Sequence, residues 1–405
     1  MSLRTNEAVA PLVSYRVRIL RAGAAAWALA GVLILLAWQV TTVHFNYRDN
    51  WSALFCTGGL HRVPPELTGT WVFPESTGYD GQFYRYEAHD PWMQRGWSQY
   101  MDAPMLRRSR ILLPALAWLL AGGQDRYIDA AYIALVWVSI FLGAFWLGRW
   151  AELHGRHPAW GLWFLLVPAT LISIDRMTLD ATFTALCAGV LYYYARGSWA
   201  RVCILLVAAA LVRDTGLLLA GGCVLYALSK RQWRNAVFAA AACLPACAWM
   251  AFVIVHVHER SQHHHHSIWH TLFNYPLIGM VMKLFSPAAY PLGRLTVVVQ
   301  ALDEIALVGC IVAVVAAILS LRRRPLRLEE WISLAFLIMV VVLGRPVFWD
   351  SAYNYARPLA PLLLVGSLPA ILGPARWALL PILLIDLRIA AQWAPQAVGI
   401  LRGLL

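Results

Sequence analysis

Carboxylates and arginines gather in one polar stretch of this sequence, between its first two apolar segments. Asp49 follows the first apolar run, and Asp80 lies between an aromatic residue and a glycine in the stretch YDGQFY. Arg107 and Arg110 stand where the next apolar segment begins. A carboxylate can act as a general base toward a hydroxyl group, and an arginine can bind a phosphate through bidentate, charge-assisted hydrogen bonds. The pattern therefore predicts a carboxylate site beside a phosphate site.

Each of these residues also has a structural interpretation. A loop aspartate commonly caps a helix or stays solvated, and Arg107 and Arg110 could anchor the chain at a membrane surface. Flat aromatic rings suit a sugar, although they are also normal in the interfacial belt of a membrane protein. Three residues beside Asp80 are candidate sugar contacts: Tyr79, Gln82 and Tyr84. The choice between Asp49 and Asp80 as the base stays open.

Further polar residues stand at the ends of later apolar runs. They are Asp180, Arg213, Asp214, Tyr353 and Arg357. Ionisable groups at membrane depth are costly, and by default they mark a functional site. An arginine at that depth has a ready partner in a lipid phosphate. Pairs within the chain, Arg213 with Asp180 or Arg357 with Asp350, are the alternative, and we predict substrate contacts at these positions.

Membrane helices must position these residues. Of the 405 residues, 60% are hydrophobic and 13% are charged, whereas a soluble domain carries about 25% charged residues. Apolar runs recur along the whole length, so we expect one transmembrane domain over residues 1–405. The runs are 22–43, 127–148, 158–174, 178–195, 199–212, 214–229, 235–256, 298–321, 330–345, 359–373 and 377–393.

Basic clusters determine the predicted orientation. The N-terminal arginines, Lys230 with Arg231, and the arginines of 322–327 should all face the cytoplasm. They do so together only if the short run 111–121 enters and leaves the membrane on one side. Segments 44–109 and 257–297 are then outer loops. We therefore predict an all-α polytopic membrane protein with about 11 transmembrane helices, one re-entrant or interfacial helix and a cytoplasmic N-terminus.

The pattern favours neither nucleic acid nor a metal ion as a ligand. The formal net charge is +12, but the basic residues lie in short segments between apolar runs and not in a stripe with interleaved aromatics. In segment 257–297, the four consecutive histidines His263 to His266 cannot all face one ion, and no cysteine lies near them. We expect a solvated outer loop there, no metal site and no cofactor, with a divalent cation left open.

Two stretches of the first outer loop resemble a known family. The sequences GYDGQFYRYEAHDP and DAPMLRRSRILLPALAWLL look like the first outer loop of bacterial multi-pass glycosyltransferases of the GT-C superfamily. A related aromatic-Asp-Gly pattern occurs in the eukaryotic GPI mannosyltransferases. Later in the chain, LVRDTGLLL (Leu211 to Leu219) and YNYARPLAPLLL (Tyr353 to Leu364) resemble further motifs of these bacterial proteins. The resemblance thus touches both halves of the chain.

The resemblance implies a reaction and a place for it. A polyprenyl-phosphate-linked sugar donor would be used at the outer face of a bacterial cytoplasmic membrane, usually with inversion, and the acceptor would be a lipid, a glycan or a protein. An acidic residue of the first outer loop would be the base, which by position is Asp80 or Asp49. The loop lacks the Asp-x-Asp or Glu-x-Asp pair that many members carry, so the resemblance does not choose between the two.

Two other functions compete with a transferase. A transporter or flippase of a lipid-linked substrate would place polar groups at the bilayer midplane, often in two repeated halves, and we find no such repeat. A large late outer loop that contains arginine would favour a polymerase or ligase of surface polysaccharide. Segment 257–297 has histidines instead, with only Arg260 and Arg294.

Overall fold

The structure is a computed structural model that describes residues 22–257, 277–322, 325–344 and 346–405. This part of the chain is almost entirely helical, and its one sheet pairs β1 (Thr57–Gly58) in parallel with β2 (Val72–Phe73). The N-terminal arginines up to Arg21, the histidines from His258 to His270, and Arg323 and Arg324 lie outside the described residues. The predicted all-α class is confirmed.

Long apolar helices make this a polytopic membrane protein. Within the described residues, six helices are long and apolar enough to cross a membrane, or up to seven if a pair bent by 58° counts as one span. The bent pair is η3 (Pro158–Leu166) with α7 (Pro168–Arg176). The six are α2 (Ala24–Tyr47), α6 (Asp125–Leu153), α11 (Trp233–Ala241) with α12 (Leu244–His256), α15 (Leu295–Ser320), α18 (Ala352–Leu372), and η4 (Arg376–Leu379) with α19 (Leu380–Leu404).

Shorter apolar helices complete the bundle. They are α8 (Asp180–Ala195), α9 (Trp199–Val212), α10 (Gly216–Ser229) and α16 (Leu328–Val342). At about 1.5 Å per residue these helices are about 21–24 Å long, which is less than the roughly 30 Å of a bilayer core. Every apolar run predicted from the sequence contains a helix. The number of helices that cross the membrane stays a prediction.

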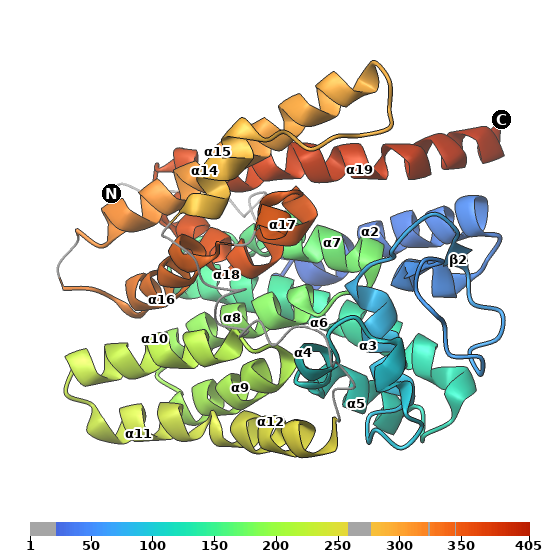
Figure 1. Ribbon diagram of the computed structural model, residues 1–405. Helices are drawn as coiled ribbons and strands as arrows, with labels where there is room; N and C mark the ends of the chain where they lie inside the picture. The colour runs from blue at the N-terminus through green and yellow to red at the C-terminus, as the bar shows by residue number, and fades with distance from the viewer. Residues whose placement is uncertain (1–21, 258–276, 323–324, 345) are drawn as a thin grey trace, which may run out of the picture.

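The polar segment between α2 and α6 folds into short elements at one end of the bundle. They are η1 (Trp51–Phe55), the two strands, α3 (Asp80–His89), η2 (Trp97–Tyr100), α4 (Pro104–Arg108) and α5 (Leu112–Leu120). In Figure 1 they occupy the right side, whereas the α10–α11 turn lies at the far left. At nine residues, α5 is only about 14 Å long, too short to cross alone.

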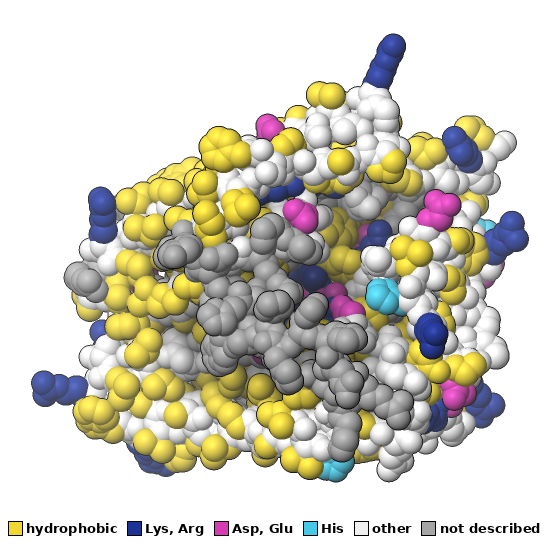
Figure 2. Space-filling model, in the orientation of Figure 1, with side chains coloured by type: hydrophobic (Ala, Val, Ile, Leu, Met, Phe, Trp, Pro, Cys, Tyr) yellow, Lys and Arg dark blue, Asp and Glu magenta, His cyan; other side chains and the backbone are white. Residues whose placement is uncertain are grey.

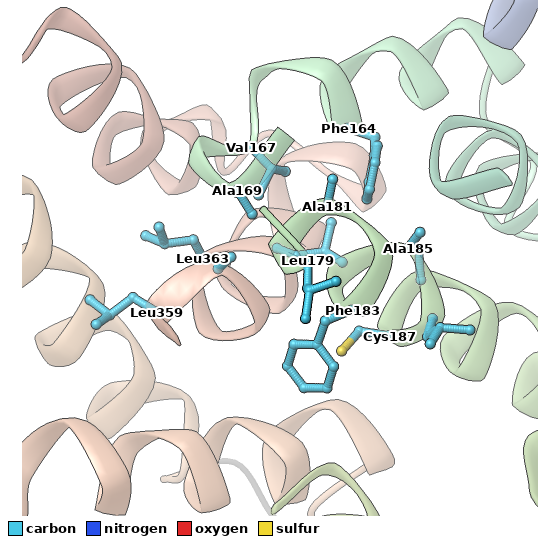
Figure 3. Packing of buried hydrophobic residues seen from close by; sticks show 14 of the residues in the cluster. Phe164, Val167, Ala169, Leu179, Ala181, Phe183, Ala185, Cys187, Leu359 and Leu363 are labelled. Atoms are coloured by element: carbon cyan, nitrogen blue, oxygen red, sulfur yellow. The ribbon is translucent and has the colours of Figure 1, made fainter. Parts of the chain in front are cut away.

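A buried apolar cluster joins α8 to α7 and α18. Figure 3 shows Leu363 of α18 beside Leu179 of this cluster. Burying such side chains is the main favourable contribution to packing between these helices. The packing holds the beginning of α8 beside α18, which brings together residues far apart in the sequence. The short helices α14 (Ile278–Phe285) and α17 (Pro346–Trp349) pack against each other before α18 begins.

Candidate functional site

Asp80 is the first residue of α3, and a glycine permits its location. A Cβ atom on Gly81 would lie 2.1 Å from the carbonyl oxygen of Arg176, so only glycine lets the first turn of α3 pack against the end of α7. A carboxylate in the first turn of a helix is stabilised by the helix dipole. Local backbone geometry therefore presents Asp80 at the junction of α3 and α7.

Two arginines hold the carboxylate of Asp80. Arg107 Nη1 lies 2.9 Å and Arg357 Nη1 lies 2.6 Å from Asp80 Oδ2. Arg107 also forms an ion pair of 2.9 Å with Asp102. Burial by itself would raise the pKa of Asp80, but the positive charges of Arg357 and Arg107 outweigh it and hold the pKa below its ordinary range. Asp80 is thus an anion clamped between two cations.

The break between α9 and α10 brings in a second group of charges. Arg213 and Asp214 lie in this break, and a Cβ on Gly216 would lie 2.3 Å from the carbonyl oxygen of Ala209. Arg213 forms an ion pair with Asp180, the first residue of α8. The tight turn therefore directs a polar pair from an otherwise apolar hairpin toward α8.

Further contacts merge these charges into one cluster. Asp180 Oδ2 lies 3.6 Å from Arg357 Nη1, and Arg110 binds Asp214 Oδ1 at 2.8 Å and Tyr84 Oη at 2.6 Å. We call the whole set the site cluster: Asp80, Asp180, Asp214, Arg107, Arg110, Arg213 and Arg357. The segments that supply it are far apart in the sequence, and Asp80 and Arg357 alone are separated by 277 positions.

Tyr79 and Tyr353 brace the arginine of α18. The hydroxyl of Tyr79 donates to the backbone oxygen of Tyr353 at 2.7 Å, and Arg357 Nε donates to the same oxygen at 2.9 Å. The guanidinium of Arg357 lies 4.7 Å from the centre of the Tyr79 ring. The hydroxyl of Tyr353 donates to Asp175 at 3.0 Å. The backbone oxygen of Tyr353 and the ring of Tyr79 therefore hold the guanidinium of Arg357 in place.

Two predicted site residues, Asp49 and Gln82, form no hydrogen bond or ion pair with the site cluster in the described part of the chain. The side chain of Asp49 is 71% exposed and lies 2.9 Å from His44 Nδ1. Gln82 is fully buried, and its amide accepts from the backbone of Gly58 at 3.1 Å and donates to that of Thr77 at 2.9 Å. Gln82 therefore supports the loop before α3, and Asp49 faces solvent.

The sequence left open whether Arg213 pairs with Asp180 and whether Arg357 pairs with Asp350. The structure has the first of these two pairs. Arg213 does pair with Asp180 within the chain. Arg357 instead pairs with Asp80 and Asp180, and Asp350 contributes a backbone oxygen to Lys283. Among the described residues, no three His, Cys, Asp or Glu side chains come together as a metal site would require.

Two acidic residues near the site cluster were not selected from the sequence. Asp175 holds Tyr353 and also accepts from Gln396 at 2.6 Å. It lies at the end of an apolar run, and Asp180 was selected as a candidate site residue because of the same kind of position. Glu87 follows Asp80 by seven residues, a spacing that places both on one face of a helix. Its carboxyl group is buried near charged groups of α4, the α4–α5 junction and the end of α3.

The site cluster can bind an anion at its solvent-facing side. Four arginines face three carboxylates, and the side chains of Asp80 and Asp214 are 15% and 38% exposed. Figure 2 shows acidic and basic side chains together near the centre of a largely apolar face. Buried ion pairs contribute little net stability because desolvation opposes them. A phosphate that replaced one carboxylate would retain the same charge-assisted hydrogen bonds.

No family model matches this chain, and neither the curated proteins nor the solved structures include a match.

Proposed function

We propose that this protein is a glycosyltransferase that moves a sugar from a polyprenyl-phosphate-linked donor to an acceptor at the outer face of a bacterial cytoplasmic membrane. The main support is the ion-pair arrangement of Asp80 with Arg107 and Arg357. It places a carboxylate directly beside two guanidinium groups at one end of a helical bundle. A base beside phosphate ligands is the minimum that this transfer requires.

The proposed step assigns one role to the carboxylate and another to the arginines. Asp80 takes the proton from an acceptor hydroxyl while that oxygen forms a bond to the anomeric carbon of the sugar. The bond from the anomeric carbon to the phosphate oxygen breaks, and the polyprenyl phosphate leaves with the electron pair. Arg107 and Arg357, with Arg110 and Arg213 nearby, stabilise the negative charge that develops on the phosphate.

Donor binding and base strength are linked in this arrangement. In the free protein the two arginines depress the pKa of Asp80, which makes it a weak base. A donor phosphate that engages Arg107 and Arg357 partly cancels their positive charge. The burial of Asp80 then acts in the opposite direction and raises its pKa. The carboxylate therefore gains basicity only when the donor is in place, and water alone is not activated.

The distribution of basic residues supports an outer location. Lys230 and Arg231 lie in the α10–α11 turn, at the end of the bundle opposite to α3 (Figure 1). Arg322 follows α15 at that same end. Basic residues in short loops favour the cytoplasmic side, so α3 and the site cluster are assigned to the outer side. A lipid-linked donor would present its phosphate at that depth.

A transporter of a lipid-linked substrate is the second candidate, and one observation favours it. Asp303 of α15 and Arg388 of α19 form a buried ion pair with a 2.7 Å contact, inside two helices long enough to span a membrane. Such pairs commonly mark a substrate pathway. An Asp303→Asn variant separates the two functions, because it should impair flux in vesicles and leave sugar transfer unchanged.

The decisive experiment is sugar transfer by the purified protein. Synthetic short-chain polyprenyl-phosphate forms of mannose, glucose, galactose and arabinose serve as donors, and a membrane extract supplies acceptors. We expect the wild-type protein to consume at least one donor, and Asp80→Asn to abolish this while the protein remains folded. The Asp49→Asn variant is the matched control. If no donor is consumed or bound, the transferase proposal fails.

A further inference from the structure

A second carboxyl group on α3 stands apart from the ion pairs. Glu87 lies on the same face of the helix as Asp80 and Tyr84, because residues four and seven positions apart share a face. Its side chain is completely buried, with 0% exposure. Neither of its carboxyl oxygens has a hydrogen-bond partner among the described residues. Since nearly all buried polar groups are hydrogen-bonded, this one requires an explanation.

Charged groups surround Glu87, yet each is engaged elsewhere. The groups that face it are three arginines from α4 and the α4–α5 junction, a carboxylate at the end of α3 and a phenol of α6, namely Arg107, Arg108, Arg110, Asp90 and Tyr132. The arginines are bound in turn to Asp80, Asp90 and Asp214. No guanidinium is therefore left over to neutralise a second anion on α3.

Physical chemistry then determines the state of this group. An unpaired buried charge is far more costly than a neutral carboxyl group. Burial raises the pKa of Glu87 to about 8, even though Arg108, Arg110 and Arg107 act to lower it. At neutral pH the group therefore keeps its proton. If it ionised, it would compete with Asp80 and Asp214 for Arg107 and Arg110.

We propose that Glu87 is a positioning residue that, by keeping its proton, reserves Arg107 and Arg110 for the site cluster and the donor phosphate. This role rests on the proposed function. It explains why a carboxyl group can be buried beside three arginines without forming a pair. In alkaline solution the proton leaves, the arginines turn toward Glu87, and the donor is held less tightly.

The pH dependence of donor use tests the proposal. In the wild type, we expect the KM for the donor to rise by about tenfold per pH unit above about pH 8, as for binding that requires one proton. Glu87→Gln imitates the neutral carboxyl, so it should match the wild type at neutral pH and lose this alkaline rise. Glu66→Gln, at an exposed position of the same outer segment, should keep the rise. An unchanged rise in Glu87→Gln overturns the role.

Thermal stability provides a readout that does not depend on sugar transfer. A pKa raised above the ordinary 4.5 means that the folded protein binds this proton more tightly than the unfolded chain does. The wild type should therefore lose stability relative to Glu87→Gln as pH rises from about 4.5 to about 8, with no further change above. A constant difference in Tm across that range overturns the proposal. If no donor is consumed at any pH, the transferase function and the positioning role fail together, while the Tm series still shows whether Glu87 keeps its proton.

Discussion

The two ends of α3 carry two charged networks that are built differently. At its C-terminal end, Arg85 binds both carboxylate oxygens of Asp129 at 2.7–2.8 Å, and His89 lies between Asp125 and Asp129 with contacts of 2.9 and 3.1 Å. Asp90 pairs with Arg108 and also accepts from the backbone of residues 94 and 95. Neighbouring segments supply all of these groups.

Apart from Glu87, whose carboxyl group has no hydrogen-bond partner in the described part of the chain, the charged groups at the N-terminal end are less completely satisfied than those at the C-terminal end. Arg107 and Arg357 both contact the same oxygen of Asp80, Oδ2. Arg213 Nε is buried and has no hydrogen-bond partner among the described residues. The difference indicates that the C-terminal network holds α3 on α6, whereas the site cluster retains capacity for a ligand. Substitutions at the two ends should therefore affect different properties.

The largest effect is expected for Asp80→Asn. Because a positioned general base contributes about 100- to 10,000-fold to a rate, we expect kcat for sugar transfer to fall by that factor. Asparagine keeps the shape of the side chain, and the elution profile and Tm of the variant check its fold. Transfer within about threefold of the wild type would mean that the N-terminal end of α3 is as structural as the C-terminal end.

Arg85→Met tests the other end of α3. It leaves Asp129 with His89 as its remaining partner, and breaking a buried pair costs about 3 kcal/mol. We expect a clear fall in Tm, with kcat per folded molecule within about threefold of the wild type. Detergent-solubilised protein is measured by thermal unfolding and by transfer in parallel. Normal stability together with lost activity would contradict the proposal that the C-terminal network stabilises the fold while the site cluster acts in transfer.

Arg357→Gln should weaken donor use by an intermediate amount. A hydrogen bond to a charged group contributes about 1.5–3 kcal/mol, so kcat/KM for the donor should fall by about 10- to 100-fold. Arg95→Gln is the matched control, because Arg95 pairs with Asp125 at the opposite end of α3 and both side chains are well exposed. Equal losses in the two variants would indicate a general electrostatic effect and not a phosphate contact.

The sequence predicted the positions of the helices and singled out every member of the site cluster. It also gave the pair of Arg213 with Asp180 as an alternative, but it did not predict the pair of Arg357 with Asp80. Helix positions follow from apolar runs and their lengths, which are local properties. Asp180, Arg213 and Arg357 were selected because charges at membrane depth are costly, whereas Asp80 was selected as a carboxylate in the polar stretch YDGQFY. The pairing of Arg357 with Asp80 depends on how α18 packs against α7 and α8, which no local pattern encodes.

Two further residues show what a sequence alone leaves unresolved. In the sequence, Glu87 stands among alternating aromatic and charged residues. The structure shows that its carboxyl oxygens lack hydrogen-bond partners among the described residues, because the arginines beside it on neighbouring elements are already paired. Asp49 and Asp80 both lie in the polar segment 44–109, so the sequence alone does not distinguish their chemistry. The turn after α2 places Asp49 at a positive φ of 61° and exposes its side chain.

The smallest effect is expected for Asp49→Asn. The side chains of Asp49 and His44 are 71% and 58% exposed, and an exposed pair of this kind contributes little because water and salt screen it. We expect kcat and KM for the donor to stay within about twofold of the wild type, measured beside Asp80→Asn on the same day and with the same donor. A loss of about 100-fold or more would instead place the base at Asp49. The ion pairs of Asp80 would then serve only to hold α3 in place, and both ends of α3 would have a structural role.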